Sequence, residues 1–158
     1  MEFMGRPPTP KEARNALAWM PGGGVFSLAP GQFTDDGEMT VTLLQTLCNT
    51  QGAYRADLVA QAYCEWEGSA PFDIGIATRS ALRVNRDRRQ DAKGLAALVQ
   101  AQAANNNADS KANGSLMRAT PLGIAACGCT VEEAIEMVAT DAAMTHPNAT
   151  CISATTAY

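Results

Sequence analysis

Histidine is almost missing from this sequence. His146 is the only one among 158 residues, and neither a G-x-S-x-G motif nor a Walker-type phosphate loop occurs. A single imidazole without a partner nucleophile cannot build a catalytic triad. Without a Walker lysine or a G-x-G-x-x-G motif, nucleoside triphosphate binding and Rossmann-type dinucleotide binding have no support either.

Long apolar runs and disulfide patterns are missing too. No apolar stretch approaches the roughly 20 residues of a transmembrane helix, and the opening MEFMGRPPTP lacks the basic and apolar regions of a signal peptide. The five cysteines are scattered and odd in number. Cys127-Gly-Cys129 lacks the spacer and the second ligand pair of a structural zinc site. We therefore expect a soluble cytoplasmic protein whose reduced thiols are buried in helices.

No segment of the sequence concentrates charge of one sign. The formal net charge of -4 gives no overall attraction to phosphate backbones, so nucleic-acid binding would require a local basic patch. The one candidate, residues 83–93 (RVNRDRRQDAK), mixes basic residues with aspartates and has no aromatic neighbours for base stacking. The sequence predicts neither a nucleic-acid partner nor a membrane partner.

Helical periodicity is what the sequence does have. Apolar residues recur at spacings of three and four, and no segment alternates as a strand does. Thr130 and Glu133 form a capping-box pattern, whereas the Asn105–Asn107 run is typical of a loop. These patterns predict an all-α fold. The expected helices cover residues 11–20, 36–51, 54–67, 75–84, 94–104 and 131–143, and a last one follows Pro147.

The stretch GQFTDDGEMT places two carboxylates at the start of a predicted helix. A helix start needs only one capping side chain. Thr34, Asp35 and Asp36 together offer hard oxygen donors, which suit Mg²⁺, Mn²⁺ or Ca²⁺ rather than zinc. Ordinary N-capping is the simpler alternative, because carboxylates also favour the positive end of a helix.

A second polar segment, NGSLMR at residues 113–118, reads as a small turn that opens a helix. Exposed backbone N–H groups at such a point, beside Gly and Ser, can bind an anion without any basic residue. The same segment is also typical of a plain loop-to-helix turn.

Four segments in order resemble the ADP-ribosylglycohydrolase family, of the type that includes the dinitrogenase-reductase-activating glycohydrolases. They are GQFTDDGEMTVTLLQTL, YCEWEGSAPFDIGIATRSAL, NGSLMRATPLGI and THPNATCISATTAY. The resemblance runs from Glu2 to the last residue. It implies one compact multi-helix domain over residues 1–158, partial relative to the family.

The resemblance also implies a role for each matching position. Thr34, Asp35 and Asp36 match the family's first metal-ligand motif, which holds Mg²⁺ or Mn²⁺ beside the ribose, with the two aspartates also counted as catalytic. Glu2 matches a catalytic carboxylate near the metals and the scissile bond. The positions that match substrate-binding residues are Asp73 and Gly75 in a substrate-side loop, Asn113, Gly114 and Ser115 around the diphosphate, and His146 in the ADP-ribose pocket.

The chemistry implied by the resemblance is hydrolysis of the N- or O-glycosidic bond between ADP-ribose and a protein side chain. Cleavage at the anomeric carbon develops oxocarbenium character, so the site must supply negative charge and activate a water molecule. The implied partner is an ADP-ribosylated protein or ADP-ribose itself.

Three features depart from the family pattern. The Gly-Asp-x-x-Gly stretch before the glutamate and the later Asp-x-Asp-Thr motif are absent, and Gly37 stands where the family usually has threonine. Half of a binuclear site would hold a hydrated Mg²⁺ weakly. A catalytically impaired ADP-ribose-binding pseudoenzyme and a helical interaction module are therefore the alternatives to an active hydrolase. Association with another copy in a homo-oligomer, or with a complementing chain that supplies the missing motif, would be a route to function.

Overall fold

The computed structural model describes residues 6–84, 87 and 91–158. Within these ranges the chain forms α-helices and no strand, apart from an isolated bridge between Gly23 and Leu28. The all-α prediction is confirmed. No described helix combines the length and the apolar character needed to cross a membrane. The helices are α1 (Pro10–Trp19), α2 (Asp35–Asn49), α3 (Ala56–Gly68), α4 (Ile76–Leu82), α6 (Leu95–Asn107), α7 (Thr120–Ala126), α8 (Val131–Ala143) and α9 (Ala149–Ala157).

The chain divides into two compact units, residues 1–34 and residues 35–158. The first unit contains α1, whose N-terminus carries a capping box between Thr9 and Glu12. Arg6 pairs with Glu12 at the surface, with 2.7 Å between Nη2 and Oε1. That one domain covers residues 1–158 stays a prediction.

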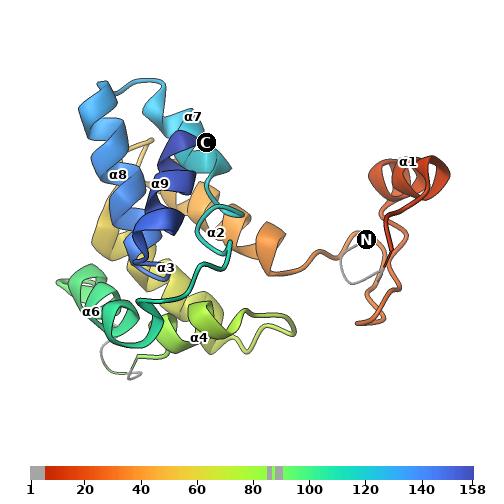
Figure 1. The fold of residues 1–158 in the computed structure, drawn as a ribbon, viewed down its shortest axis with the longest axis horizontal. Coiled ribbons are helices and arrows are strands. Elements are labelled where there is room, and N and C mark those ends of the chain that lie inside the picture. Colours follow the sequence, from red (N-terminus) through yellow and green to blue (C-terminus); the bar gives the residue numbers. More distant parts are fainter. Residues whose placement is uncertain (1–5, 85–86, 88–90) are drawn as a thin grey trace. The chain divides into compact units, whose positions relative to one another are not determined.

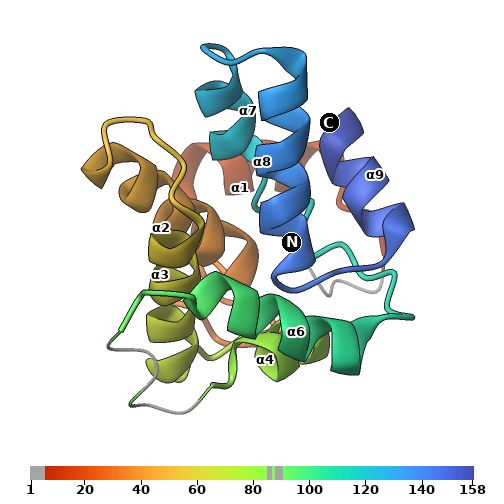
Figure 2. The same ribbon diagram turned by 90° about the vertical axis from the view of Figure 1, so that its left-hand side faces the viewer.

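The second unit holds the other helices. Figures 1 and 2 show α8 and α9 side by side at one end and α4 and α6 at the other. α7 contacts α8 and α2, and α3 packs against α2, α4 and α6. Apolar side chains of the inward faces form the core, because each amphipathic helix can bury only one stripe. Its fully buried members include Met39, Leu43, Val59, Tyr63, Leu82, Val99, Leu122 and Met144.

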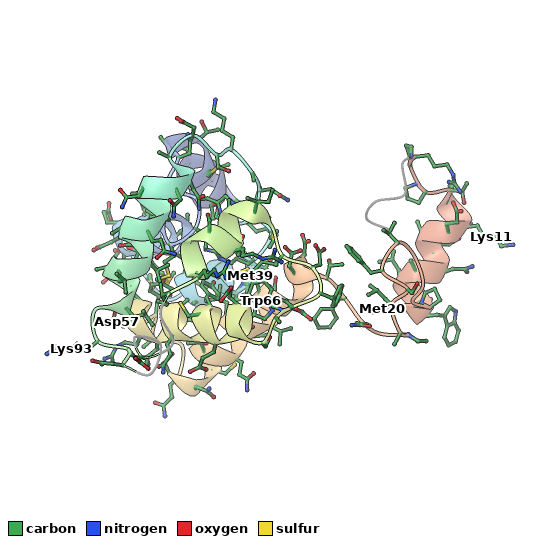
Figure 3. The ribbon with its side chains drawn as sticks, turned by 90° about the horizontal axis from the view of Figure 1, so that it is seen from below. Lys11, Met20, Met39, Asp57, Trp66 and Lys93 are labelled. Carbon is green, nitrogen blue, oxygen red and sulfur yellow. The ribbon has the colours of Figure 1, made fainter. Side chains whose placement is uncertain are left out.

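Two polar side chains of the second unit fix helices to one another. Trp66 packs against the core, and its indole N–H donates to Glu38 of α2 at 2.8 Å (Figure 3). Asp57 of α3 accepts the backbone N–H groups of Gly94, at 2.9 Å, and Ala96, at 3.0 Å. Asp57 therefore caps α6 from a distant part of the sequence, and local residues alone do not set the start of that helix.

Most helix boundaries agree with the sequence prediction to within two residues, and the capping box of Thr130 and Glu133 starts α8 as expected. The expected loop at Asn105–Asn107 is wrong, because α6 continues through Asn107. The buried Asn107 amide donates to the carbonyls of Ala77, at 2.7 Å, and Thr145, at 2.9 Å, and accepts from the Ser80 hydroxyl at 2.7 Å. These tertiary hydrogen bonds outweigh the weak helix propensity of asparagine.

All five cysteines are free thiols, which agrees with the prediction that no disulfide framework forms. Their predicted burial is wrong for three of them. Cys64 and Cys151 are buried, but Cys48, Cys127 and Cys129 are exposed. Cys127 and Cys129 lie in the turn that follows α7, where no neighbouring helix of the described chain covers them.

Replacing Asn107 with alanine should lower the free energy of unfolding by about 2–3 kcal/mol, because two carbonyls and a hydroxyl lose their partner. Asn105→Ala is the matched control: Asn105 is exposed in the same helical turn, so its change should stay within about 0.5 kcal/mol. Urea denaturation of the two variants measures the difference. Equal effects would show that Asn107 acts only through helix propensity.

Candidate functional site

A pocket of about 440 Å³ lies in the second unit. It is bounded by the start of α2, the start of α4, the end of α6, the segment before α7 and His146, which follows α8. This volume is within the range of small-ligand sites. The lining includes Asp35, Gly75, Thr78, Asn113, Gly114 and His146.

Residues that the sequence analysis selected separately meet in this pocket. Asp35, Gly75, Asn113, Gly114 and His146 all line it, although they are far apart in the chain. The other predicted site residues lie elsewhere. Asp36, Asp73 and Ser115 are outside the lining, Thr34 lines an apolar pocket of the first unit, and Glu2 lies outside the described residues.

Asp35 is nearly buried at the first position of α2. Its Oδ1 accepts the backbone N–H of Asp36 at 3.0 Å, and its Oδ2 accepts the backbone N–H of Gly75 at 3.3 Å. The carboxylate therefore satisfies a donor at the start of α2 and holds the loop before α4 against that helix. Capping, the simpler reading of this aspartate, explains part of its role.

The carboxylates at the start of α2 have the oxygen chemistry that Mg²⁺ prefers. However, the described residues contain no group of three or more His, Cys, Asp or Glu side chains that could hold a metal ion. Mg²⁺ keeps several waters and is commonly bound through one or two carboxylates. Asp35 and Asp36 thus fit one side of a hydrated Mg²⁺ and do not by themselves form a closed metal site.

Residues 113–117 form a single helical turn, closed by the Met117 N–H donating to the Asn113 carbonyl at 3.0 Å. The helix expected to open here begins only at Thr120. Within the described chain, the N–H groups of Gly114, Ser115 and Leu116 donate no hydrogen bond. Because Gly114 and Ser115 are buried, such donors call for a partner from solvent or a ligand.

Gly114 is required by the close approach of two side chains. A Cβ atom at this position would lie 2.5 Å from Cε1 of His146 and 3.1 Å from Oγ1 of Thr78. The absence of a side chain therefore allows the His146 ring and the Thr78 hydroxyl to lie against the turn.

Arg118 lies outside the pocket lining and connects segments that form the pocket. Its sequence context does not indicate this role. The guanidinium is fully buried. Its Nε donates to Oδ2 of Asp141 at 3.0 Å, and its Nη2 donates to the Asp141 carbonyl at 2.8 Å. Its Nη1 donates to the Gly114 carbonyl at 2.9 Å and to the Thr145 hydroxyl at 2.8 Å. One side chain thus joins α8, the 113–117 turn and the segment that carries His146.

Two tyrosines complete the surroundings of this ion pair. The Tyr63 ring lies 4.7 Å from Cζ of Arg118, and its hydroxyl donates to Oδ1 of Asp141 at 3.0 Å. Tyr54 approaches the same oxygen at 3.5 Å. Burial and the charge of Asp141 raise the pKa of Tyr63 well above its usual value. Burial lowers the pKa of Arg118, but the charge of Asp141, its hydrogen bond to Arg118 and the two tyrosines together outweigh burial. The net pKa is raised, so the guanidinium stays charged.

His146 is almost completely buried beside this network. Its Nδ1 lies 2.8 Å from the Thr145 hydroxyl. Burial, followed by the positive charge of Arg118, lowers the pKa of His146 to about 4. The ring is therefore neutral at physiological pH.

Replacing Arg118 with methionine should lower the free energy of unfolding by about 3–5 kcal/mol, because it leaves the Asp141 charge buried without a cation. The double variant Arg118→Met/Asp141→Leu should recover part of this loss, although the Tyr63 hydroxyl then lacks its acceptor. Thermal and urea unfolding of both variants measure the recovery.

The matched control is Arg6→Met, which removes an arginine–carboxylate pair at the surface. It should change stability little, since solvent screens exposed pairs. A double variant no more stable than Arg118→Met, or a control as damaging as the buried variant, would contradict the assigned role of Arg118.

Comparison with known proteins bears on this pocket. A family model described as ADP-ribosylglycohydrolase matches residues 1–158. Similarity to individual proteins is more limited. "Putative ADP-ribosyl glycohydrolase L543" of Acanthamoeba polyphaga mimivirus is 36% identical over 115 residues, which cover 68% of this chain and 32% of that protein.

Two bacterial relatives match shorter segments. The ADP-ribosyl-[dinitrogen reductase] glycohydrolase of Rhodospirillum rubrum is 36% identical over 64 residues, or 40% of this chain and 21% of that protein. The ADP-ribosylarginine hydrolase Tri1 of Pseudomonas putida (strain GB-1) is 43% identical over 70 residues, or 40% of this chain and 19% of that protein. The chain thus matches about a third or less of the length of these relatives.

Proposed function

We propose, because the chain belongs to the ADP-ribosylglycohydrolase family, that its pocket binds ADP-ribose and takes part in hydrolysing the glycosidic bond between ADP-ribose and a protein side chain. The N- or O-glycosidic bond is the reacting group. The partner would be an ADP-ribosylated protein or free ADP-ribose. Relatives named as glycohydrolases for ADP-ribosylated dinitrogen reductase and as ADP-ribosylarginine hydrolases support this substrate class.

The observation that carries the proposal is the turn at residues 113–117. Three successive backbone N–H groups there, from Gly114 to Leu116, find no acceptor in the described chain. The charged Arg118 lies directly behind the same turn and holds the Gly114 carbonyl. Of these three residues, Gly114 lines the pocket. N–H donors of one turn with a positive charge behind them suit an anion such as a diphosphate. Asn113 also lines the pocket, which supports its proposed contact with the diphosphate.

The reaction also needs negative charge near the anomeric carbon, where an oxocarbenium-like transition state develops. Among the described residues, Asp35 is the carboxylate that lines the pocket. Its bond to the Gly75 N–H holds it in place, so it can stabilise positive charge without first reorganising. Asp73 lies in the same loop as Gly75 but outside the pocket lining, and Glu2 lies outside the described residues. Their proposed roles therefore rest on the sequence alone.

We also propose that Asp35 and Asp36 hold Mg²⁺, or Mn²⁺, through carboxylate oxygens. When bound, such an ion acts as a Lewis acid and lowers the pKa of bound water. For Thr34 the proposal rests on its place beside these aspartates in the sequence.

Binding without turnover is the second candidate function. The absence of a group of three metal-binding side chains among the described residues favours it. Association with a second copy or with a complementing chain would add further ligands. Exposed apolar side chains such as Ile124 and Val131 of the second unit support such an interaction.

Calorimetric titration with ADP-ribose tests the proposed pocket. The unaltered chain should bind, and Gly114→Ala should weaken binding by about tenfold or more, because the new methyl group collides with the His146 ring and displaces a donor of charge-assisted hydrogen bonds. Gly123→Ala is the matched control, since a Cβ atom there meets no neighbour within 4 Å. Absence of binding by the unaltered chain, or equal binding by both variants, would refute the assignment.

A release assay separates the two candidate functions. For the hydrolase, release of ADP-ribose from a modified protein should require Mg²⁺, and Asp35→Asn should reduce it by at least about tenfold, because the amide lacks the negative charge. Glu136→Gln, an exposed change on α8, should leave release unchanged. Binding of ADP-ribose with no release at any Mg²⁺ concentration would instead establish the binding-only function.

A further inference from the structure

The hydrogen-bond donors and acceptors around His146 determine which ring nitrogen carries the proton, as well as the position of the ring. Thr145 is fully buried, and its hydroxyl oxygen accepts from Nη1 of Arg118 at 2.8 Å. The same oxygen lies 2.8 Å from Nδ1 of His146. Arg118, Thr145 and His146 therefore form a chain of three polar groups that ends in the pocket.

This chain can run in only one direction without leaving a donor unsatisfied. A guanidinium donates hydrogen bonds and cannot accept them, whereas a hydroxyl has one proton to donate. In the described chain, the only acceptor that the Thr145 hydroxyl reaches is Nδ1 of His146. If Nδ1 carried a proton, the buried hydroxyl proton would have no acceptor, which is costly. Nδ1 is therefore the acceptor.

The second ring nitrogen is available to a ligand. Nε2 of His146 makes no hydrogen bond with any described residue. Yet no fully covered side-chain nitrogen or oxygen in the described structure lacks a partner. Nε2 must accordingly be in contact with solvent, and since His146 lines the pocket, that is where the atom is reached.

We propose that Arg118 and Thr145 are positioning residues, which hold His146 as the neutral tautomer with its proton on Nε2, so that the ring offers an N–H donor to the pocket. The donor selects a ligand oxygen that accepts hydrogen bonds and disfavours a cation or a donor at the same point. That this oxygen belongs to the diphosphate or a ribose of ADP-ribose rests on the proposed function.

The charges around the ring are consistent with this state. Arg118 faces it through Thr145, Asp141 balances Arg118 from α8, and Asp35 lines the same pocket from α2. The positive charge of Arg118 acts on the ring and opposes an imidazolium. The lowered pKa of His146, about 4, agrees with a ring that stays neutral at physiological pH.

Nitrogen NMR of the ligand-free chain with labelled histidine tests the tautomer directly. His146 is the only histidine in the sequence, so one pair of ring nitrogen signals reports on it. At neutral pH we expect a protonated Nε2 and an unprotonated Nδ1. A protonated Nδ1, or a doubly protonated ring at pH 7, would overturn the proposal.

Thr145→Val keeps the shape of the side chain and removes the hydroxyl. It should allow a substantial population with Nδ1 protonated and should weaken ADP-ribose binding by about tenfold, the effect of losing one hydrogen bond to a charged group. Thr145→Ser should restore both the spectrum and the binding. Thr42→Val, which removes a hydroxyl bonded only within α2, is the control and should change neither.

An unchanged ring spectrum in Thr145→Val would overturn the positioning role. If Thr145→Val does not fold, the spectra of the unaltered chain and of Thr145→Ser still decide the tautomer. Failure of the unaltered chain to bind ADP-ribose would refute the proposed function and leave the tautomer result standing. The two failures are therefore distinguishable.

Discussion

The buried ion pair of Arg118 and Asp141 is the interaction on which the site depends. Removing two charges from water is costly, and a buried pair repays that cost only when further hydrogen bonds satisfy both groups. Here Arg118 also donates to the carbonyls of Gly114 and Asp141 and to the Thr145 hydroxyl, while Asp141 accepts from Tyr63. The pair is stable because every neighbouring element contributes a partner, so those elements cannot shift independently.

This arrangement places the positive charge of Arg118 behind the pocket. None of the described residues that line the pocket is a lysine or an arginine. An anion would meet backbone N–H groups and a neutral imidazole. The positive charge of Arg118 would act on the anion from behind the lining residue Gly114, whose carbonyl it binds. Such donors are fixed before a ligand arrives, and little conformational entropy is lost on binding, unlike with flexible surface lysines. Under the proposed function, such a pocket would favour an anion of defined shape over anions in general.

How far the sequence predicts this structure depends on whether the cause is local. The capping box of Thr130 and Glu133 and the spacing of apolar residues are local, and the helices follow them. The helical Asn107 and the cap of α6 by Asp57 depend on residues about 30 to 40 positions away, which no local pattern shows. Arg118 is the last residue of the NGSLMR motif, and nothing near it in the sequence indicates its contact with Asp141 of α8.

The two adjacent carboxylates at the start of α2 are not equivalent. Both oxygens of Asp35 accept backbone N–H groups, one of them from the loop before α4. The Asp36 side chain makes no hydrogen bond to any described residue. A cation at this helix start would therefore take Asp36 without competition and would have to share Asp35 with Gly75. A carboxylate oxygen that also accepts a backbone N–H binds a metal less strongly, so Asp35 and Asp36 would suit a hydrated, exchangeable ion. Asp35 has a structural role even when no ion is bound, because it joins the loop before α4 to α2.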